Sequence, residues 1–579
     1  MNARRNWTIG IAVLSGVFGL GPAHAFQSAR YDVIIRNGRV LDGSGNPFVY
    51  ADVGITGDTI TAVGSLEHAT AARTIDARGQ YVTPGFIALH EHIEGDVIAG
   101  RGGLPNFTTQ GFTTAVIDAD GRTRWPLAKQ REDLEKAGTA LNLVPMVGHG
   151  TVRGMAMGDD FMRAATPAEI DKMKQLVRQG MEEGAFGLTA GLEYSPGRWS
   201  TEEEVLELAK VVAPYGGHYQ AHLRSQGQYP KWQLPSSAQR ATTYIDTKQF
   251  TNIDAVVETI TIAKRAGVPV ILDHLHPKGP REWGSGRIIT QLVDRAWSEG
   301  HRVYISMHSY EAYDEQIILV PRWALVAKPV KGLGAYDSSA EADYTNMRAT
   351  LKRHLDSVDG PMIRRDIEYE IDRQGGPDGL LIMDYPDKSL VGKTLGQVAK
   401  MRHEDPVDTA IYFQLNGFDR VGGVEFRAFA VSLLDLEEFM RKDYTGVCTD
   451  RTAASVDDRS TGRFIHPGTF GTAPRRIKTF VFDKKITTLP FAIRSMTWLS
   501  AQMLGLRDRG RIAPGLKADI VVFDAETLTD KATYFEPYQY SEGINFVLVN
   551  GRFVVDGGKP GASKPGRVLQ RQRLASATD

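Results

Sequence analysis

The segment Pro84-Gly85-Phe86-Ile87-Ala88-Leu89-His90-Glu91-His92 joins a short apolar strand to two histidines. In an extended chain residues i and i+2 point to the same side, so both imidazoles can face one metal ion. A single histidine after a strand is more often a capping or surface residue, whereas the His-x-His spacing favours a metal site. Such a pair needs further ligands, which the ends of other strands can supply.

Short apolar stretches alternate with helical stretches along the middle of the chain. We predict strands at residues 113–117, 143–147, 186–189, 217–221, 268–272 and 303–306, and helices at 167–184, 201–215, 253–266 and 288–299. Alternation over this length predicts a parallel α/β architecture, whose closed form is a TIM-like (β/α)8 barrel. Catalytic groups of such a barrel lie at the carboxyl ends of its strands.

Histidines and aspartates follow several of these predicted strands. They are Asp118 and Asp120, His149, His222, Asp273-His274 and, much later, Asp450. Since the strand ends meet at one mouth of a barrel, we expect a shared metal site formed by His90, His92, His222, His274 and Asp450. Either Asp118 or Asp120 fits a position between two metal ions, and the other caps a turn; the spacing leaves both assignments open.

Both ends of the mature chain carry hairpin signals. Asn37-Gly38 and Gly57-Asp58 connect β-branched runs near the start, and Asn550-Gly551 does so near the end. Each block is too small to hold a core alone, so we expect a small β-sandwich built from both chain ends. The expected division is a signal peptide at 1–25, an amino-terminal sandwich segment at 26–83, the catalytic barrel at 84–320, an insertion or lid with returning barrel elements at 321–445, a final barrel segment at 446–508, and a carboxyl-terminal sandwich segment at 509–579 that includes an irregular tail from 565.

Composition excludes several classes of protein. The 68 Lys and Arg against 69 Asp and Glu give a net charge of −1, so no global field attracts nucleic acid. The single cysteine, Cys448, excludes an intramolecular disulfide and a multi-cysteine zinc site. We expect Cys448 to be a small buried hydrophobe.

The first 25 residues have the pattern of a secretory signal. Arg4 and Arg5 precede an apolar run at 11–20, and Ala23-His24-Ala25 is a small-residue cleavage site. The apolar run is shorter than the ~20 residues that span a bilayer. We therefore predict export with cleavage near Ala25, a periplasmic location in a bacterium, and no stable membrane insertion.

The chain resembles the amidohydrolase superfamily and, within it, the N-acyl-D-amino-acid deacylases (D-aminoacylases). The resemblance runs over nearly the whole mature chain. Its more specific motifs are Gly148-His149-Gly150-Thr151-Val152-Arg153, Gly191-Leu192-Glu193-Tyr194-Ser195-Pro196-Gly197 and His466-Pro467-Gly468-Thr469-Phe470-Gly471.

The resemblance implies roles for individual residues. His90 and His92 match a metal pair, His222 and His274 match the ligands of a tightly held zinc, and Asp450 matches the catalytic aspartate. Asp120 falls where the family usually has a metal-bridging cysteine, and a carboxylate is a harder donor than a thiolate. The implied cofactor is one or two zinc ions.

Two departures from the family concern the substrate. His276 stands where the family usually has a lysine, and His308 where it usually has a tyrosine, and those positions resemble a clamp on the substrate carboxylate. A carboxylate would then need a protonated histidine or another cation such as Arg224. The expected substrate-binding residues are Tyr194, His149, His276, His308 and Arg224.

The predicted function is zinc-dependent hydrolysis of a C–N amide bond in an N-acyl amino acid or related N-acyl amine, with Asp450 as general base and acid. A dipeptidase or a cyclic-amide or ester hydrolase on the same scaffold is the alternative, and a non-catalytic periplasmic binding protein is an alternative of another class. Cyclic-amidase relatives usually bridge two metals with a carboxylated lysine, and residues 143–151 contain none. The expected partner is a small N-acyl amine; the sequence gives neither the oligomeric state nor a preference for D or L substrates.

Overall fold

The structure is a computed structural model that describes residues 30–228, 234, 236, 250–313, 316–328 and 342–571. The predicted signal peptide at 1–25 lies outside the described residues. Within these ranges no helix combines the length and apolar character needed to cross a membrane.

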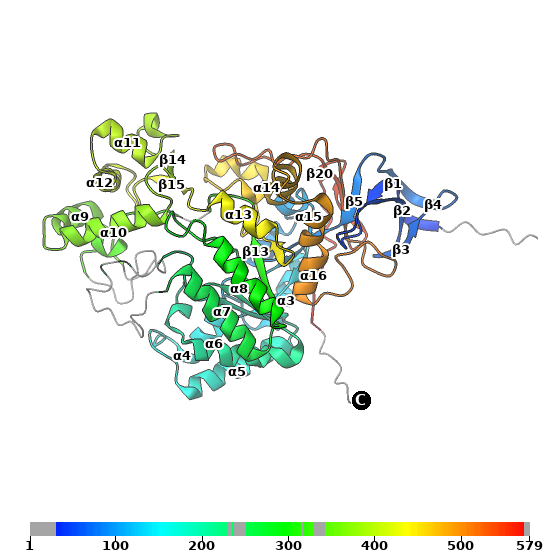
Figure 1. Cartoon of the computed structure of the whole chain (residues 1–579), viewed down its shortest axis with the longest axis horizontal. Coiled ribbons are helices and arrows are strands. Elements are labelled where there is room, and N and C mark those ends of the chain that lie inside the picture. The colour runs from blue at the N-terminus through cyan, green and yellow to red at the C-terminus, as the bar shows by residue number, and fades with distance from the viewer. Residues whose placement is uncertain are drawn as a thin grey trace, which may run out of the picture.

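Strands from both ends of the chain form one nine-stranded sheet (Figure 1). Its members are β1 (Arg30–Val40), β2 (Val49–Thr56), β3 (Thr59–Gly64), β4 (Thr70–Asp76), β5 (Tyr81–Pro84), β17 (Ile520–Phe523), β18 (Ile544–Val549), β19 (Arg552–Asp556) and β20 (Lys559–Pro560). The two ends join where β5 pairs antiparallel with β17, with Pro84 opposite Ile520. The predicted sandwich is therefore one continuous sheet, and Ile35 and Val53 share a core with Ile520 and Leu548 across the junction.

Two parallel sheets occupy the middle of the molecule. The three-stranded sheet contains β6 (Phe86–Ala88), β7 (Phe112–Val116) and β8 (Asn142–Val144), and the six-stranded sheet contains β9 (Val147–Gly148), β10 (Gly187–Gly191), β11 (His218–His222), β12 (Val270–Leu272), β13 (Val303–Met307) and β16 (Thr445–Val447). Every residue of these strands is buried. Each predicted strand coincides with one of them except that residues 143–147 form two, β8 and β9.

Helices connect and cover the parallel strands. They are α3 (Leu127–Ala137), α5 (Pro167–Glu182), α6 (Glu202–Val212), η3 (Ala213–Tyr215), α7 (Asn252–Ala266) and α8 (Gly286–Ser298). Side-chain caps start α5, α6 and α7. At α7 the Thr251 hydroxyl accepts from the Asp254 amide, and the Asp254 carboxylate accepts from the Thr251 amide. Short helices follow the strand ends, namely α1 (Glu94–Asp96), η1 (Val97–Arg101), α2 (Pro105–Thr108), α4 (His149–Met157) and η2 (Gly197–Trp199).

Residues 321–445 contain a separate group of elements. These are η4 (Arg322–Ala324), α9 (Met347–Leu355), α10 (Gly360–Arg373), β14 (Leu380–Asp384), η5 (Lys388–Leu390), α11 (Leu395–Arg402), α12 (Pro406–Asn416), β15 (Glu425–Ala428) and α13 (Leu433–Met440). β14 and β15 pair antiparallel. Figure 1 shows α9–α12 and this hairpin on the side of the molecule away from the nine-stranded sheet, whereas α13 packs beside α8.

The chain after β16 returns to the middle of the molecule. Its helices are η6 (Val456–Thr461), α14 (Gly468–Arg475), η7 (Arg476–Asp483), α15 (Leu489–Met496) and α16 (Trp498–Leu504). Residues 565–571, at the start of the expected irregular tail, form no helix or strand apart from one β-bridge, yet they are packed against the molecule. Val568 bridges to Leu143 in parallel, and Arg571 donates to the carbonyls of Tyr215 and Leu504, so this segment is packed along β8.

Candidate metal centre

His90 and His92 follow β6 and face Asp450, which lies three residues after the end of β16. The Nε2 atoms of His90 and His92 lie 3.2 Å apart. Asp450 Oδ1 lies 3.2 Å from His92 Nε2 and 3.4 Å from His90 Nε2. These three side chains converge as the strand-end pattern predicted.

A second histidine pair comes from the six-stranded parallel sheet. His222 is the last residue of β11 and His274 follows β12, and His222 Nδ1 lies 2.9 Å from His274 Nε2. Two imidazole nitrogens at this distance need either a shared proton or a cation between them.

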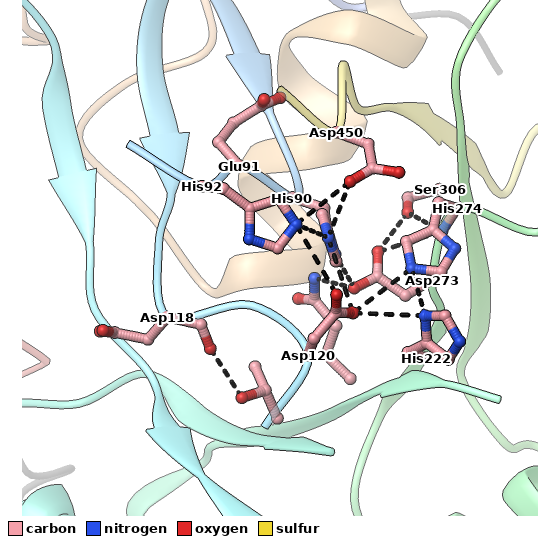
Figure 2. Close-up of polar contacts among 12 residues, drawn as sticks. His90, Glu91, His92, Asp118, Asp120, His222, Asp273, His274, Ser306 and Asp450 are labelled. Atoms are coloured by element: carbon pink, nitrogen blue, oxygen red, sulfur yellow. Dashed lines mark hydrogen bonds and ion pairs between the residues drawn. The ribbon is translucent and has the colours of Figure 1, made fainter. Parts of the chain in front are cut away.

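Asp120 lies between the two histidine pairs (Figure 2). Its Oδ1 is 3.3 Å from His222 Nδ1 and 3.5 Å from His274 Nε2, and its Oδ2 is 3.7 Å from His92 Nε2. Asp118 points elsewhere, because its carboxylate accepts from Gln130 Nε2 at 2.7 Å and from the Met146 amide at 3.2 Å. Of the two aspartates left open by the sequence, the geometry favours Asp120.

Strained backbone positions gather at this centre. Asp118, Asp120, His274 and Asp450 have φ values of 64°, 54°, 30° and 59°. Positive φ is unfavourable for residues other than glycine and persists where the surrounding structure imposes it, most often at functional sites.

Three of the four histidines have a partner on the ring nitrogen that faces away from Asp120. Asp273 hydrogen-bonds His90 Nδ1, Glu193 Oε2 lies 3.2 Å from His222 Nε2, and the Gln226 side-chain amide lies 3.0 Å from His274 Nδ1. Such partners set the tautomer and orientation of metal-binding histidines. Neither Glu193 nor Gln226 has a role predicted from the sequence, although Glu193 stands next to Tyr194 in one of the deacylase motifs.

Glu91, the middle residue of His-x-His, holds the segment that carries Asp450. Its carboxylate is buried and accepts from the Thr449 amide at 2.7 Å and from the Arg451 amide at 3.1 Å. These two bonds flank Asp450 and support its positive φ. The sequence analysis did not predict this role of Glu91. The one feature that could have indicated it is the position of Glu91 between two predicted metal ligands.

The electrostatics of the centre favour a cation. Burial by itself would lower the pKa of His90, but the carboxylates of Asp273 and Asp120 hold that pKa well above its ordinary value. Burial opposes ionisation of Asp450 too, yet its bonds to His90 and His92 hold its pKa well below the usual range. Asp450 is therefore ionised at neutral pH.

A cavity of about 570 Å³ opens over these groups. Tyr194 lines it, with its ring centroid 4.2 Å from that of His222. The described lining includes six cationic side chains, namely Arg101, Lys278, Arg322, Arg427, Arg451 and Arg463. A cavity of this size accommodates a small molecule.

His276 and His308 line the same cavity as a stacked pair. Their ring centroids are 3.9 Å apart with an interplanar angle of 26°. Burial lowers the pKa of His276 to about 3, and burial together with His276 and Arg451 holds the pKa of His308 well below its ordinary value. Both rings are neutral at pH 7, so neither supplies the positive charge considered above.

Two expected substrate-binding residues do not line the cavity. His149 is fully buried at the start of α4, where its Nε2 lies 2.8 Å from Glu204 Oε1. Arg224 is buried and pairs with Glu258 through Nε and Nη2 at 2.9–3.0 Å. The structure does not bring these two side chains to the cavity, because each is paired with a buried carboxylate.

Comparison with known proteins agrees with this geometry. The family described as amidohydrolase matches residues 389–555. The N-acyl-D-glutamate deacylase of Alcaligenes xylosoxydans xylosoxydans is 28% identical over 94% of this chain and 97% of its own length, and the D-aminoacylase of the same organism is 27% identical over 94% and 99%. The family match covers part of the carboxyl-terminal half of the chain, and the similarity to the two deacylases extends over nearly its whole length.

Solved structures of amidohydrolases share the fold. N-acyl-D-glutamate deacylase from Bordetella bronchiseptica, solved with zinc and a phosphonate mimic of the tetrahedral intermediate, has a TM-score of 0.70 at 24% identity, covering 93% of this chain and 100% of its own. D-aminoacylase, described with a binuclear metal center, has a TM-score of 0.68 at 26% identity over the same shares.

Proposed function

We propose that this protein uses zinc to hydrolyse the C–N bond of an N-acyl amino acid or a related linear N-acyl amine. The observation that carries the proposal is the convergence of two histidine pairs on Asp120, beside Asp450, at the floor of one cavity. The relatives named above, which act on N-acyl-D-amino acids, support the same reaction class.

The side chains fit zinc. Nitrogen and carboxylate donors suit this ion, and Zn–N bonds of about 2.0–2.1 Å in tetrahedral geometry put two ligand nitrogens about 3.3 Å apart. The two histidine pairs have N···N separations of 3.2 and 2.9 Å. Asp120, His222 and His274 would hold one ion, and His90 and His92 a second, with Asp120 shared and Asp450 adjacent.

Bound zinc supplies a Lewis acid that polarises the scissile carbonyl and lowers the pKa of water from 15.7 towards about 7. Asp450, ionised and facing the cavity, accepts the proton of the attacking water. It then delivers that proton to the amide nitrogen, which leaves only when protonated. We assign Tyr194 to contact with the substrate, because its ring lines the cavity beside His222.

We also propose that the two parallel sheets form one closed (β/α)8 barrel. Counting β8 and β9 as one wall position, the three and six strands give eight positions. The Leu89 amide donates to the Val447 carbonyl at 2.9 Å, which links the ends of β6 and β16, and the Phe186 amide donates to Pro145 between β8 and β9. The division at 26–83, 84–320, 321–445, 446–508 and 509–579, and export with cleavage near Ala25, belong to the same proposal.

The test combines metal analysis with an activity panel. Purified protein is expected to contain one or two zinc ions per chain and to lose activity with a chelator and regain it with zinc. The panel contains N-acyl-D- and N-acyl-L-amino acids, dipeptides and carboxylate-free amides. Zinc-loaded protein that hydrolyses no amide would refute the proposal.

A further inference from the structure

Arg451 is held beside the metal centre by its backbone. Its amide donates to Glu91 Oε2 at 3.1 Å, and its carbonyl accepts from the His92 amide at 3.0 Å. The side chain lines the cavity and is only 3% exposed. The guanidinium therefore lies next to the backbone of Asp450 and away from bulk water.

The positive charge of Arg451 has no carboxylate partner among the described residues. Nη1 donates to the Asp450 carbonyl at 2.6 Å, while Nε and Nη2 are buried and have no hydrogen-bond partner there. Three other buried arginines pair with an acid, namely Arg153 with Glu204, Arg224 with Glu258 and Arg509 with Asp519, whereas Arg476 donates to the Gly446 carbonyl and to Ser495 Oγ. A buried guanidinium without a counter-charge is strongly destabilising, so an anion that enters the cavity would restore the balance.

The two unpartnered nitrogens form one edge of the guanidinium. Nε–H and Nη2–H point in parallel, which is the side-on arrangement that binds both oxygens of a carboxylate. Both nitrogens are buried while the residue lines the cavity, so a carboxylate that enters the cavity would reach this edge once the guanidinium turns towards it.

The stacked histidines do not supply the positive charge that a carboxylate needs. His276 Nδ1 lies 2.7 Å from the His274 carbonyl oxygen, which only accepts, so Nδ1 carries the proton and Nε2 of the neutral ring has a lone pair. His308 Nδ1 accepts from the Tyr310 amide, which leaves its Nε2–H as a donor. Two charged rings stacked at 3.9 Å would repel each other.

We propose that Arg451 binds a carboxylate of the substrate and thereby determines specificity. The proposal rests on the amide hydrolysis proposed above. The carboxylate belongs either to the amine half or to the acyl half of the substrate, since both halves enter the same cavity.

The experiment compares three compounds with zinc-loaded protein. N-acetylleucine carries a carboxylate on the amine half, N-succinylleucinamide carries one on the acyl half, and N-acetylleucinamide carries none; each is used as both enantiomers. The variants are Arg451→Gln, Arg451→Lys and, as a matched control, Arg463→Gln, which removes an exposed arginine of the same cavity.

Arg451→Gln is expected to lower kcat/KM for one of the two carboxylate compounds by about 100-fold or more, because a buried charged hydrogen-bond partner is lost. Arg451→Lys should recover some of this loss, and N-acetylleucinamide should change by less than about threefold. An equal loss on charged and neutral compounds would show that Arg451 only positions Asp450, and no loss on either carboxylate compound would show that it binds none; both results overturn the proposal.

A binding measurement separates this proposal from the proposed function. Leucine and succinate carry the same two carboxylates, and one of them should raise the Tm of zinc-loaded wild type and of Arg463→Gln, but not of Arg451→Gln. If wild type hydrolyses no amide, the proposed function fails and the Tm shifts still decide the role of Arg451. Equal shifts in all three proteins, or none in wild type, would overturn it.

Discussion

Replacing Asp450 by asparagine tests the assignment of the proton carrier. The substitution keeps the size of the side chain and removes the group that accepts the proton. General acid–base catalysis contributes typically 10²–10⁴-fold, and at 1.36 kcal/mol per tenfold this is about 2.7–5.4 kcal/mol of the barrier. We therefore expect kcat to fall by about 100- to 10 000-fold.

The structure predicts that this variant still binds zinc. Asp120, His222 and His274 remain within reach of one another without Asp450. The assay is steady-state hydrolysis of the best compound in the panel, with the zinc content of each preparation measured in parallel. A matched control is Asp458→Asn, which removes another carboxylate that lines the cavity but pairs with Arg101, and it should change kcat by less than about threefold.

Two outcomes would refute the reasoning. Near-normal kcat in Asp450→Asn with full zinc content would remove Asp450 from proton transfer. Loss of zinc together with activity would mean that Asp450 acts chiefly as a metal ligand, contrary to its position outside the Asp120–His222–His274 group.

Three further predictions concern the metal and the stability of the fold. Asp273→Asn weakens the partner of His90 Nδ1 and should lower zinc affinity about 10- to 100-fold in a chelator competition. Unchanged affinity would show that the charge of Asp273 does not support zinc binding through His90. Asp120→Cys replaces a hard donor by a soft one and should raise the affinity for zinc relative to manganese at least about tenfold in a competition assay; an unchanged ratio would exclude Asp120 from the first coordination sphere. His218 is buried, and burial lowers its pKa to about 3, below the ordinary 6.5, so the unfolded state binds the proton first and stability falls as the pH drops through 6.5 towards 3. When the pH is lowered from 7 to 5, His218 should reduce the free energy of unfolding of the wild type by about 2 kcal/mol. His218→Leu lacks this group, so its free energy of unfolding, measured by urea denaturation at both pH values, should fall by about 2 kcal/mol less than that of the wild type. Equal decreases in the two proteins would contradict the prediction.

Local sequence determined the parallel strands and the residues that end them. An apolar strand followed by a histidine or an aspartate is a pattern within a few neighbouring residues, so His90, His92, His222, His274 and Asp450 could be found from the sequence. The same is true of the hairpin signals at the two ends, because Asn-Gly and Gly-Asp turns depend on local backbone conformation.

Tertiary structure decided which side chains are available to a ligand. His149 and Arg224 looked equivalent to other candidates in the sequence, but Glu204 and Glu258, which lie 55 and 34 residues away along the chain, occupy them. The choice of Asp120 over Asp118 depends on which carboxylate faces two histidine pairs from other strands. The lack of a carboxylate partner for Arg451 among the residues that the structure describes likewise depends on how those residues pack around it. Short-range sequence patterns specify the local backbone conformation and its periodicity. The burial and the charge partners of a side chain depend instead on residues that are distant in the sequence and come together only in the folded chain.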